Sequence, residues 1–139
     1  MIMHNVSKLA FIVNFATARE ESDKVREATS TVKEIDDATN KHDRFMLTAD
    51  GQSGFIVRNG GELIALFSTV KGRGHDLVQI AVQCGAEYLD CFDGFLPKLY
   101  AKHGFVTVKR ELNWTLGGPD VVYMQIPSKL EAAEIGDIA

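Results

Sequence analysis

With 139 residues, of which 45% are apolar and 24% charged, the chain is long enough to fold as one globular domain around a substantial core. Its formal net charge of −4 gives no reason to expect nucleic acid as a partner, and the apolar run from Leu9 to Val13 is far too short to span a bilayer. The two cysteines, Cys84 and Cys91, lack the spacing of a zinc site, so we expect a reduced protein without a metal. Because the start of the chain lacks the pattern of a signal peptide, we expect a cytoplasmic location.

The first 44 residues indicate a mainly helical region. Over residues 7–20 the apolar side chains recur at helical spacing, and Ser7 is a suitable N-cap. The side chains that share the expected apolar face are Leu9, Ile12, Val13 and Ala16. Residues 17–44 are more polar, with apolar positions three or four apart that predict a helix or a pair of helices. A short strand at 29–32 is the alternative for part of this segment.

From Phe45 onward the pattern predicts three antiparallel strands. The first covers Phe45–Thr48 and the second Gly54–Arg58. Asn59-Gly60-Gly61 is a strong hairpin turn, because asparagine and glycine tolerate a positive φ. The third strand, Glu62–Ser68, therefore runs back beside the second.

The second half of the chain alternates short helices and strands. The expected elements are a helix at 77–82 ended by Gly85, a strand at 88–92, a helix at 96–103, a strand at 105–108, a loop at 113–120, a strand at 121–126 and, over 127–139, a frayed tail or loose helix. The strand–helix–strand passage over 63–92 needs a crossover, which predicts a parallel strand pair. We therefore expect an α+β fold around a mixed, mostly antiparallel sheet with a splayed parallel pair, where ligands favour the diverging strand ends.

The stretch Lys71-Gly72-Arg73-Gly74-His75-Asp76 carries the clearest functional signal. It lies between an apolar strand and a helix, so its backbone N–H groups gather at the positive end of the helix dipole. A basic, glycine-rich turn in this position predicts an anion site, and the natural occupant is a phosphate-bearing cofactor.

Over about residues 45–126 the chain resembles the GNAT superfamily of N-acetyltransferases. In that superfamily a turn of the form R/Q-x-x-G-x-G/A holds the pyrophosphate of acetyl-CoA. Lys71 stands at the basic position and Gly74 at the first glycine, Gly72 and Arg73 fit the commoner form of the turn, and Asp76 departs from its last position. The stretch from Leu99 to Phe105 is similar to the superfamily's common LYEKxGF ending.

A further likeness is to small GNAT-like proteins of phages and prophages. It lies in the segment from Leu89 to Gly94 and in the Leu96-Pro97 pair that follows. Asp93 stands where the superfamily often has an asparagine that contacts the cofactor. The resemblance implies a single GNAT-like domain over 1–139, with a helical part at 1–44, the core sheet and cofactor site at 45–126, and the tail.

The resemblance also implies an activity, namely transfer of an acetyl group from acetyl-CoA to an amine of a small molecule or protein. The residues it places at the cofactor are Leu66, Phe67, Ser68, Lys71, Gly72, Arg73, Gly74, His75 and Asp93. Tyr100 is implied as the acid that protonates the departing thiolate, and Trp114 as a residue beside the acceptor. Partners other than the amine are neither nucleic acid nor membrane, and the resemblance allows a homodimer.

Several alternatives stay open at this stage. The general base can be Asp90, Asp93, Glu62 or a chain of water molecules. Tyr100 can be an ordinary packed helix residue, and Trp114 can close the core instead of contacting the acceptor. The alternative for the whole chain is a catalytically silent GNAT-like protein that serves a phage or prophage as an accessory or interaction protein.

Overall fold

The computed structural model describes residues 1–127, and these divide into two compact units, Met1–Ala86 and the described part of Glu87–Ala139. The predicted tail lies outside the described residues, apart from Pro127. Whether the chain is a single domain stays a prediction, although the division at residue 86 differs from the boundary expected at 44. Within the described range, no helix is both long and apolar enough to cross a membrane.

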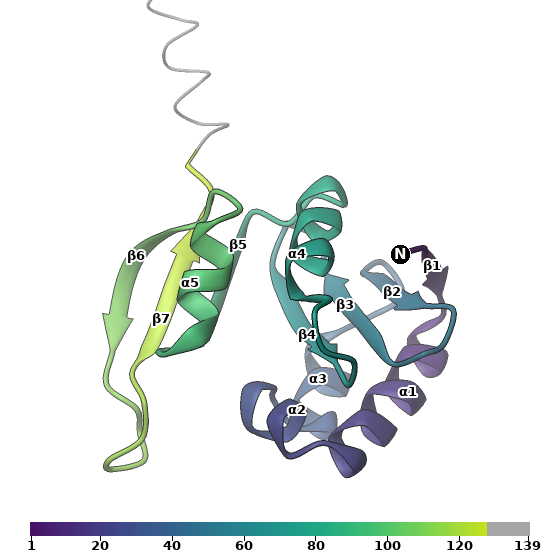
Figure 1. Cartoon of the computed structure of the whole chain (residues 1–139), viewed down its shortest axis with the longest axis horizontal. Helices are drawn as coiled ribbons and strands as arrows, with labels where there is room; N and C mark the ends of the chain where they lie inside the picture. Colours follow the sequence, from purple (N-terminus) through teal and green to yellow (C-terminus); the bar gives the residue numbers. More distant parts are fainter. Residues whose placement is uncertain (128–139) are drawn as a thin grey trace, which may run out of the picture. The chain divides into compact units, whose positions relative to one another are not determined.

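The first unit is a four-stranded antiparallel sheet with helices on both faces (Figure 1). Its elements are β1 (Met3–Val6), α1 (Lys8–Glu21), α2 (Asp23–Ala28), α3 (Val32–Ala38), β2 (Arg44–Thr48), β3 (Ser53–Val57), β4 (Leu63–Ser68) and α4 (Gly74–Gln83). The strands lie in chain order, β1-β2-β3-β4. The three predicted strands are therefore confirmed, and β1 is an additional strand that pairs with β2.

Alternating side chains of the sheet divide the first unit into two apolar layers. Ile56 of β3 belongs to the cluster beneath α1, whereas its neighbour Phe55 points to the opposite face, where α4 packs on β3. Leu77 and Val78 of α4 are fully buried on that side. The turn predicted at 71–76 to bind the cofactor, hereafter the cofactor turn, thus leads into a helix that packs firmly on the sheet.

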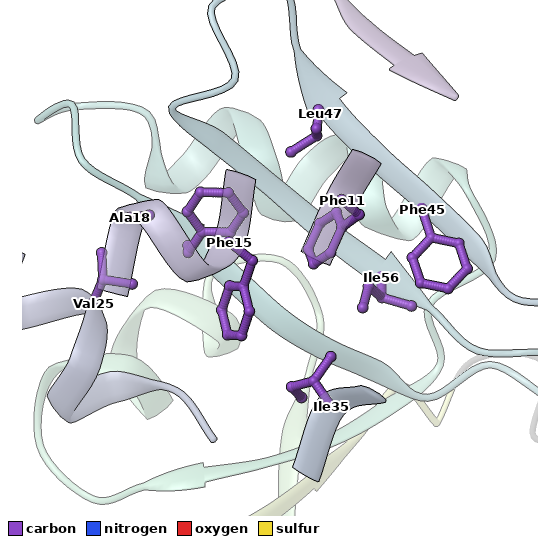
Figure 2. Close-up of a cluster of buried hydrophobic side chains, with 9 residues drawn as sticks. Phe11, Phe15, Ala18, Val25, Ile35, Phe45, Leu47 and Ile56 are labelled. Atoms are coloured by element: carbon purple, nitrogen blue, oxygen red, sulfur yellow. The ribbon is translucent and has the colours of Figure 1, made fainter. Parts of the chain in front are cut away.

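The helices α1, α2 and α3 cover the other face with an aromatic core. Figure 2 shows Phe11 and Phe15 of α1 in one cluster with Phe45 and Ile56 of the sheet, with Phe11 beside Phe45. The rings of Phe11 and Phe15 stack with centroids 5.8 Å apart, and both contact Phe67 of β4 edge-on. This cluster fixes β4 against the helices, immediately before the turn.

The face of α1 that is buried differs from the predicted one. Leu9 and Val13 are 73% and 56% exposed, while Phe11, Phe15 and Ala18 are buried. Residues 9–13 are apolar all round the helix, so the sequence offers two competing faces. The face with two phenylalanines one turn apart is the buried one, because it removes more apolar surface from water. The predicted N-cap is confirmed, since the Ser7 side chain accepts a hydrogen bond of 3.1 Å from the Ala10 N–H.

The predicted pair of helices is confirmed by α2 and α3, and the alternative strand at 29–32 is wrong. Thr31 begins α3 with a capping box, in which its side chain and that of Glu34 satisfy each other's backbone N–H groups. Val25 and Ile35 are buried in the core beneath α1. Two short amphipathic helices with their own caps therefore explain this polar segment.

The second unit is a three-stranded antiparallel sheet with one helix. Its elements are β5 (Tyr88–Phe92), α5 (Phe95–Ala101), β6 (Val106–Glu111) and β7 (Val121–Gln125), and the strand order is β5-β7-β6. The α5 helix begins one residue earlier and ends two residues earlier than predicted, because residues 102–104 form a turn in which Gly104 has a φ of 97°, and β6 is longer than predicted. The expected α+β fold is confirmed, although β4 and β5, expected as a parallel pair, belong to different sheets.

Candidate functional site

The outermost strand of the first sheet, β4, carries a bulge in its middle. Between two paired positions the chain advances two residues along β3, from Gly54 to Ile56, but three along β4, from Phe67 to Ile64. Ala65 takes up the extra residue with a φ of 53°, which is unusual for a residue other than glycine. A bulge bends a strand and disturbs its hydrogen-bonding ladder, so β4 changes direction just before Leu66.

The three residues after the bulge are those predicted to orient the cofactor. Leu66, Phe67 and Ser68 complete β4, which is the last strand of its sheet, so within residues 1–86 no further strand pairs with its outer side. Phe67 is buried against α1, which leaves the backbone rather than this side chain as the group able to meet a ligand. An unpaired strand edge offers alternating N–H and C=O groups that can bind amide groups of an extended ligand.

The turn that follows β4 presents its backbone to solvent. Lys71 and Gly72 are exposed, and Gly72 has a φ of 84° with no heavy atom within 4 Å of where a Cβ would stand. The helix α4 then begins at Gly74, earlier than the predicted start at Leu77. Its first N–H groups have no partner within the helix and lie at the positive end of the dipole. These donors, with the exposed Lys71 ammonium, form a set that suits a diphosphate.

Arg73, also predicted at the cofactor, directs its side chain to the loop between β2 and β3. Its guanidinium donates to both carboxylate oxygens of Asp50, with Nη2–Oδ2 and Nη1–Oδ1 distances of 2.8 and 3.2 Å. This contact raises the pKa of Arg73 and holds the pKa of Asp50 far below its ordinary value. The sequence around Asp50 does not indicate this pairing, because its partner lies 23 residues further along the chain.

His75 and Asp76 lie exposed in the first turn of α4. A carboxylate there interacts favourably with the helix dipole, but it repels an anion bound at the same end. The departure of Asp76 from the superfamily's pattern therefore has a definite electrostatic cost for a diphosphate.

Tyr100 lies buried in α5 of the second unit, with 6% of its surface exposed. Its ring packs edge-on against Phe105, with centroids 5.7 Å apart. Burial raises the pKa of Tyr100, and electrostatic interaction with Cys91 and Asp90 raises it further. The phenol is therefore protonated at neutral pH, as a proton donor must be. Its packing against Phe105 agrees equally with the alternative that Tyr100 is an ordinary packed helix residue.

Asp93 of the second unit is engaged by its own neighbours. Its carboxylate accepts hydrogen bonds from the two guanidinium nitrogens of Arg110, at 3.0 and 3.4 Å, and from the Gly94 N–H at 3.0 Å. The contact with Arg110 lowers the pKa of Asp93. Nearby, burial raises the pKa of the Cys91 thiol to about 12, so this cysteine is not a thiolate nucleophile at neutral pH.

Trp114 lies in the loop between β6 and β7 and is 83% exposed. The alternative in which it closes the core is therefore wrong. Leu112 and Leu116 of the same loop are also exposed. This loop presents three large apolar side chains to solvent, which is typical of a surface that contacts a ligand or partner.

Comparison with solved structures identifies the fold. An aminoglycoside 6'-acetyltransferase of type Ii superposes with a TM-score of 0.62 at 16% identity, covering 93% of this chain and 99% of its own. A spermidine N-acetyltransferase, a SpeG chimera from Vibrio cholerae and hSSAT, has a TM-score of 0.61 at 14% identity, covering 91% and 95%. The chain has the GNAT fold. The NatC complex bound to Gag peptide and CoA agrees, with a TM-score of 0.59 at 13% identity over 91% of this chain and 97% of that one. No protein-family model and no curated protein sequence matches this chain.

Within this GNAT fold the turn passes a simple chemical test for the cofactor that the fold implies. A diphosphate needs several convergent donors and close approach of the backbone. The exposed Lys71, the open Gly72 and the start of α4 provide both. The resemblance predicted from the sequence is thus confirmed at the level of fold, and the likeness to phage proteins stays a prediction.

Proposed function

We propose that the chain is an acetyl-CoA-dependent N-acetyltransferase that acts on an amine of a small molecule or protein. The observation that carries the proposal is the path from the bulge at Ala65, along the outer edge of β4, to the open turn and the start of α4. This path supplies strand-edge hydrogen bonds and then anion donors, in the order in which the pantetheine arm and the diphosphate follow each other. The solved structures with the same fold include N-acetyltransferases and one complex that contains CoA.

The cofactor roles follow from this order. The backbone of Leu66, Phe67 and Ser68 would bind the amide groups of the pantetheine arm, and an N–H of this stretch would polarise the thioester carbonyl. Lys71, Gly72, Gly74 and His75 would hold the diphosphate. When bound, acetyl-CoA supplies an activated acetyl group that an amine can accept. Arg73 and Asp93 are the exceptions among the predicted residues, because the Arg73 guanidinium is bound to Asp50 and the Asp93 carboxylate is bound to Arg110.

Proton transfer needs an acid and a base. Tyr100 would donate a proton to the departing thiolate, since its raised pKa keeps the phenol protonated. Among the candidates for the base, Asp93 accepts hydrogen bonds from Arg110, and this contact lowers its pKa, which makes it a weaker base. The base that removes the amine proton would then be Asp90, Glu62 or a chain of water molecules.

The acceptor would lie against Trp114, whose exposed ring can contact the apolar part of an amine. The net charge of −4 favours a cationic acceptor weakly. The three similar structures concern an aminoglycoside, spermidine and a peptide complex, so these three classes of amine are the first to test.

One pair of observations favours a second function, that of a catalytically silent GNAT-like protein. The Asp76 carboxylate lies in the first turn of α4, where it opposes a diphosphate, and Asp93 is held by Arg110 instead of being open to a ligand. A chain with these features could keep the fold as an accessory or interaction protein after losing the cofactor.

Titration calorimetry with CoA, followed by a thiol-release assay, distinguishes the two functions. An N-acetyltransferase binds CoA and releases it from acetyl-CoA when an aminoglycoside, a polyamine or a peptide amine is added. A ligand that binds the folded state also raises the melting temperature. Absence of binding heat and of a melting shift at millimolar CoA would overturn the enzyme and favour the silent protein.

A further inference from the structure

The Arg73 guanidinium forms a bidentate ion pair with the Asp50 carboxylate, which neutralises its charge. Besides its two hydrogen bonds to Asp50, its Nη1 donates to the Ser53 hydroxyl at 3.0 Å. The planar fork of arginine fits a carboxylate in this geometry, which a lysine ammonium cannot reproduce. Arg73 therefore joins the end of the cofactor turn to the loop between β2 and β3.

Asp50 is also held by its own loop. The Thr48 hydroxyl donates to its Oδ1 at 2.6 Å, and the Gln52 N–H donates to the same oxygen at 3.0 Å. These contacts orient the carboxylate in the position where Arg73 binds it.

Two hydroxyl groups connect the beginning of the turn, at Val70, to Ser53, which also accepts from Arg73. Ser53 is fully buried, and its Oγ lies 2.8 Å from the Oγ of Ser68. Ser68 donates its single proton to the Val70 carbonyl at 2.7 Å, so Ser53 must be the donor between the two serines. The Val70 N–H donates back to Ser68 at 3.1 Å. Hydrogen bonds therefore run from Arg73 through Ser53 and Ser68 to Val70, on both sides of Lys71 and Gly72.

We propose, on the basis of the function proposed above, that Asp50, Ser53 and Arg73 are positioning residues that hold the cofactor turn open. In this arrangement Arg73 is not a phosphate ligand. The exposed Lys71 and the backbone N–H groups bind the diphosphate, and the network around the buried Ser53 keeps them in the binding geometry before the cofactor arrives.

Two ways in which Arg73 could act predict opposite results for Asp50→Asn. If Arg73 were a phosphate ligand, removing its competing carboxylate would release its charge and strengthen CoA binding. If Arg73 positions the turn, the loss of a charged hydrogen-bonding partner weakens CoA binding by about tenfold. Asp37→Asn is the matched control, because it removes the same charge from an exposed pair with Lys33 in the same unit.

Calorimetric titration of CoA into the whole chain and its variants tests the proposal. We expect Asp50→Asn and Arg73→Lys each to weaken binding by about tenfold, with Asp37→Asn unchanged. Arg73→Lys keeps the positive charge but cannot bind the carboxylate in a bidentate manner. It therefore still tests the positioning role of Arg73 if Asp50→Asn fails to melt cooperatively. Unchanged or tighter binding in Asp50→Asn, or full affinity in Arg73→Lys, would overturn the positioning role while leaving the proposed function intact. Absence of CoA binding by the unaltered chain would instead overturn both.

Discussion

Two exposed segments of this protein differ in what they show to solvent. The turn between β4 and α4, residues 69–73, exposes a glycine backbone and a lysine, while the Arg73 side chain and the Val70 backbone form hydrogen bonds with the sheet. The loop between β6 and β7, residues 112–120, exposes a tryptophan and two leucines. The first segment offers fixed donors, and the second offers apolar surface.

The two segments are also held differently. The turn is connected to β3 and to the loop before it by the Asp50–Arg73 ion pair and by the hydroxyl groups of Ser53 and Ser68. Within the loop, Asn113 donates to the Pro119 carbonyl and accepts from the Thr115 N–H, and at the end of the loop the Asp120 carbonyl accepts from the Asp93 N–H at 2.8 Å. A segment fixed to the core suits a ligand with constant chemistry, such as a diphosphate. A segment held by its own residues and at its end suits an acceptor that varies among proteins of one fold.

The largest expected effect is on the chemical step. Tyr100→Phe removes the phenolic proton donor, and we expect kcat to fall by about 100-fold while the dissociation constant for CoA stays unchanged. Steady-state kinetics together with calorimetry measures both quantities. An unchanged kcat would assign Tyr100 to packing alone, as its contact with Phe105 allows.

The next effect separates the loop from the turn. Trp114→Ala should raise the KM of the amine by about tenfold and leave CoA binding and the melting temperature unchanged, because the ring is exposed. Kinetics at saturating acetyl-CoA and a melting curve check the prediction. A lower melting temperature with an unchanged KM would show instead that the loop serves stability.

A smaller effect is expected at the start of α4, where one substitution should strengthen CoA binding and lower the melting temperature. Asp76→Asn removes a carboxylate that repels the diphosphate, so CoA binding should become about threefold tighter. The same change removes a favourable interaction with the helix dipole, so the melting temperature should fall slightly. Weaker CoA binding in this variant would contradict the placement of the diphosphate at this turn.

The smallest effect concerns pH. Because Arg73 lowers the pKa of Asp50, its folded pKa lies below the unfolded value of about 3.9. The stabilising contribution is therefore complete above that unfolded value and is lost as the pH falls toward the folded one. Urea unfolding of the unaltered chain and of Asp50→Asn should differ at pH 7, and the difference should shrink below about pH 4. A difference that is independent of pH would show that the ion pair contributes nothing to stability.

The elements that the sequence predicted well depend on short-range chemistry. The turn at Asn59-Gly60-Gly61 needs glycines at positive φ, which Gly60 and Gly61 adopt, and the Ser7 cap needs only a hydroxyl before a helix. The open turn before α4 belongs to the same class, because its glycines and the following helix are visible along the chain, while the binding of an anion there stays a prediction.

The features that the sequence did not predict depend on partners far along the chain. The short polar strand β1 forms only because β2, some forty residues later, pairs with it. The bulge at Ala65 arises from pairing with β3, and an alanine in a sequence does not indicate a positive φ. The contact between Arg73 and Asp50 likewise joins two residues that are 23 positions apart, so the local sequence, which predicts Arg73 as a cofactor ligand, does not indicate this ion pair.

An NMR titration of the amide signals with CoA tests the central claim most directly. If the edge of β4 and the following turn bind the cofactor, the shifts in the first unit will concentrate on residues 66–75, and the amides of Gly72 and Gly74 will be among those that move. An absence of shifts, or shifts that leave residues 66–75 unmoved, would contradict the cofactor site proposed for this protein.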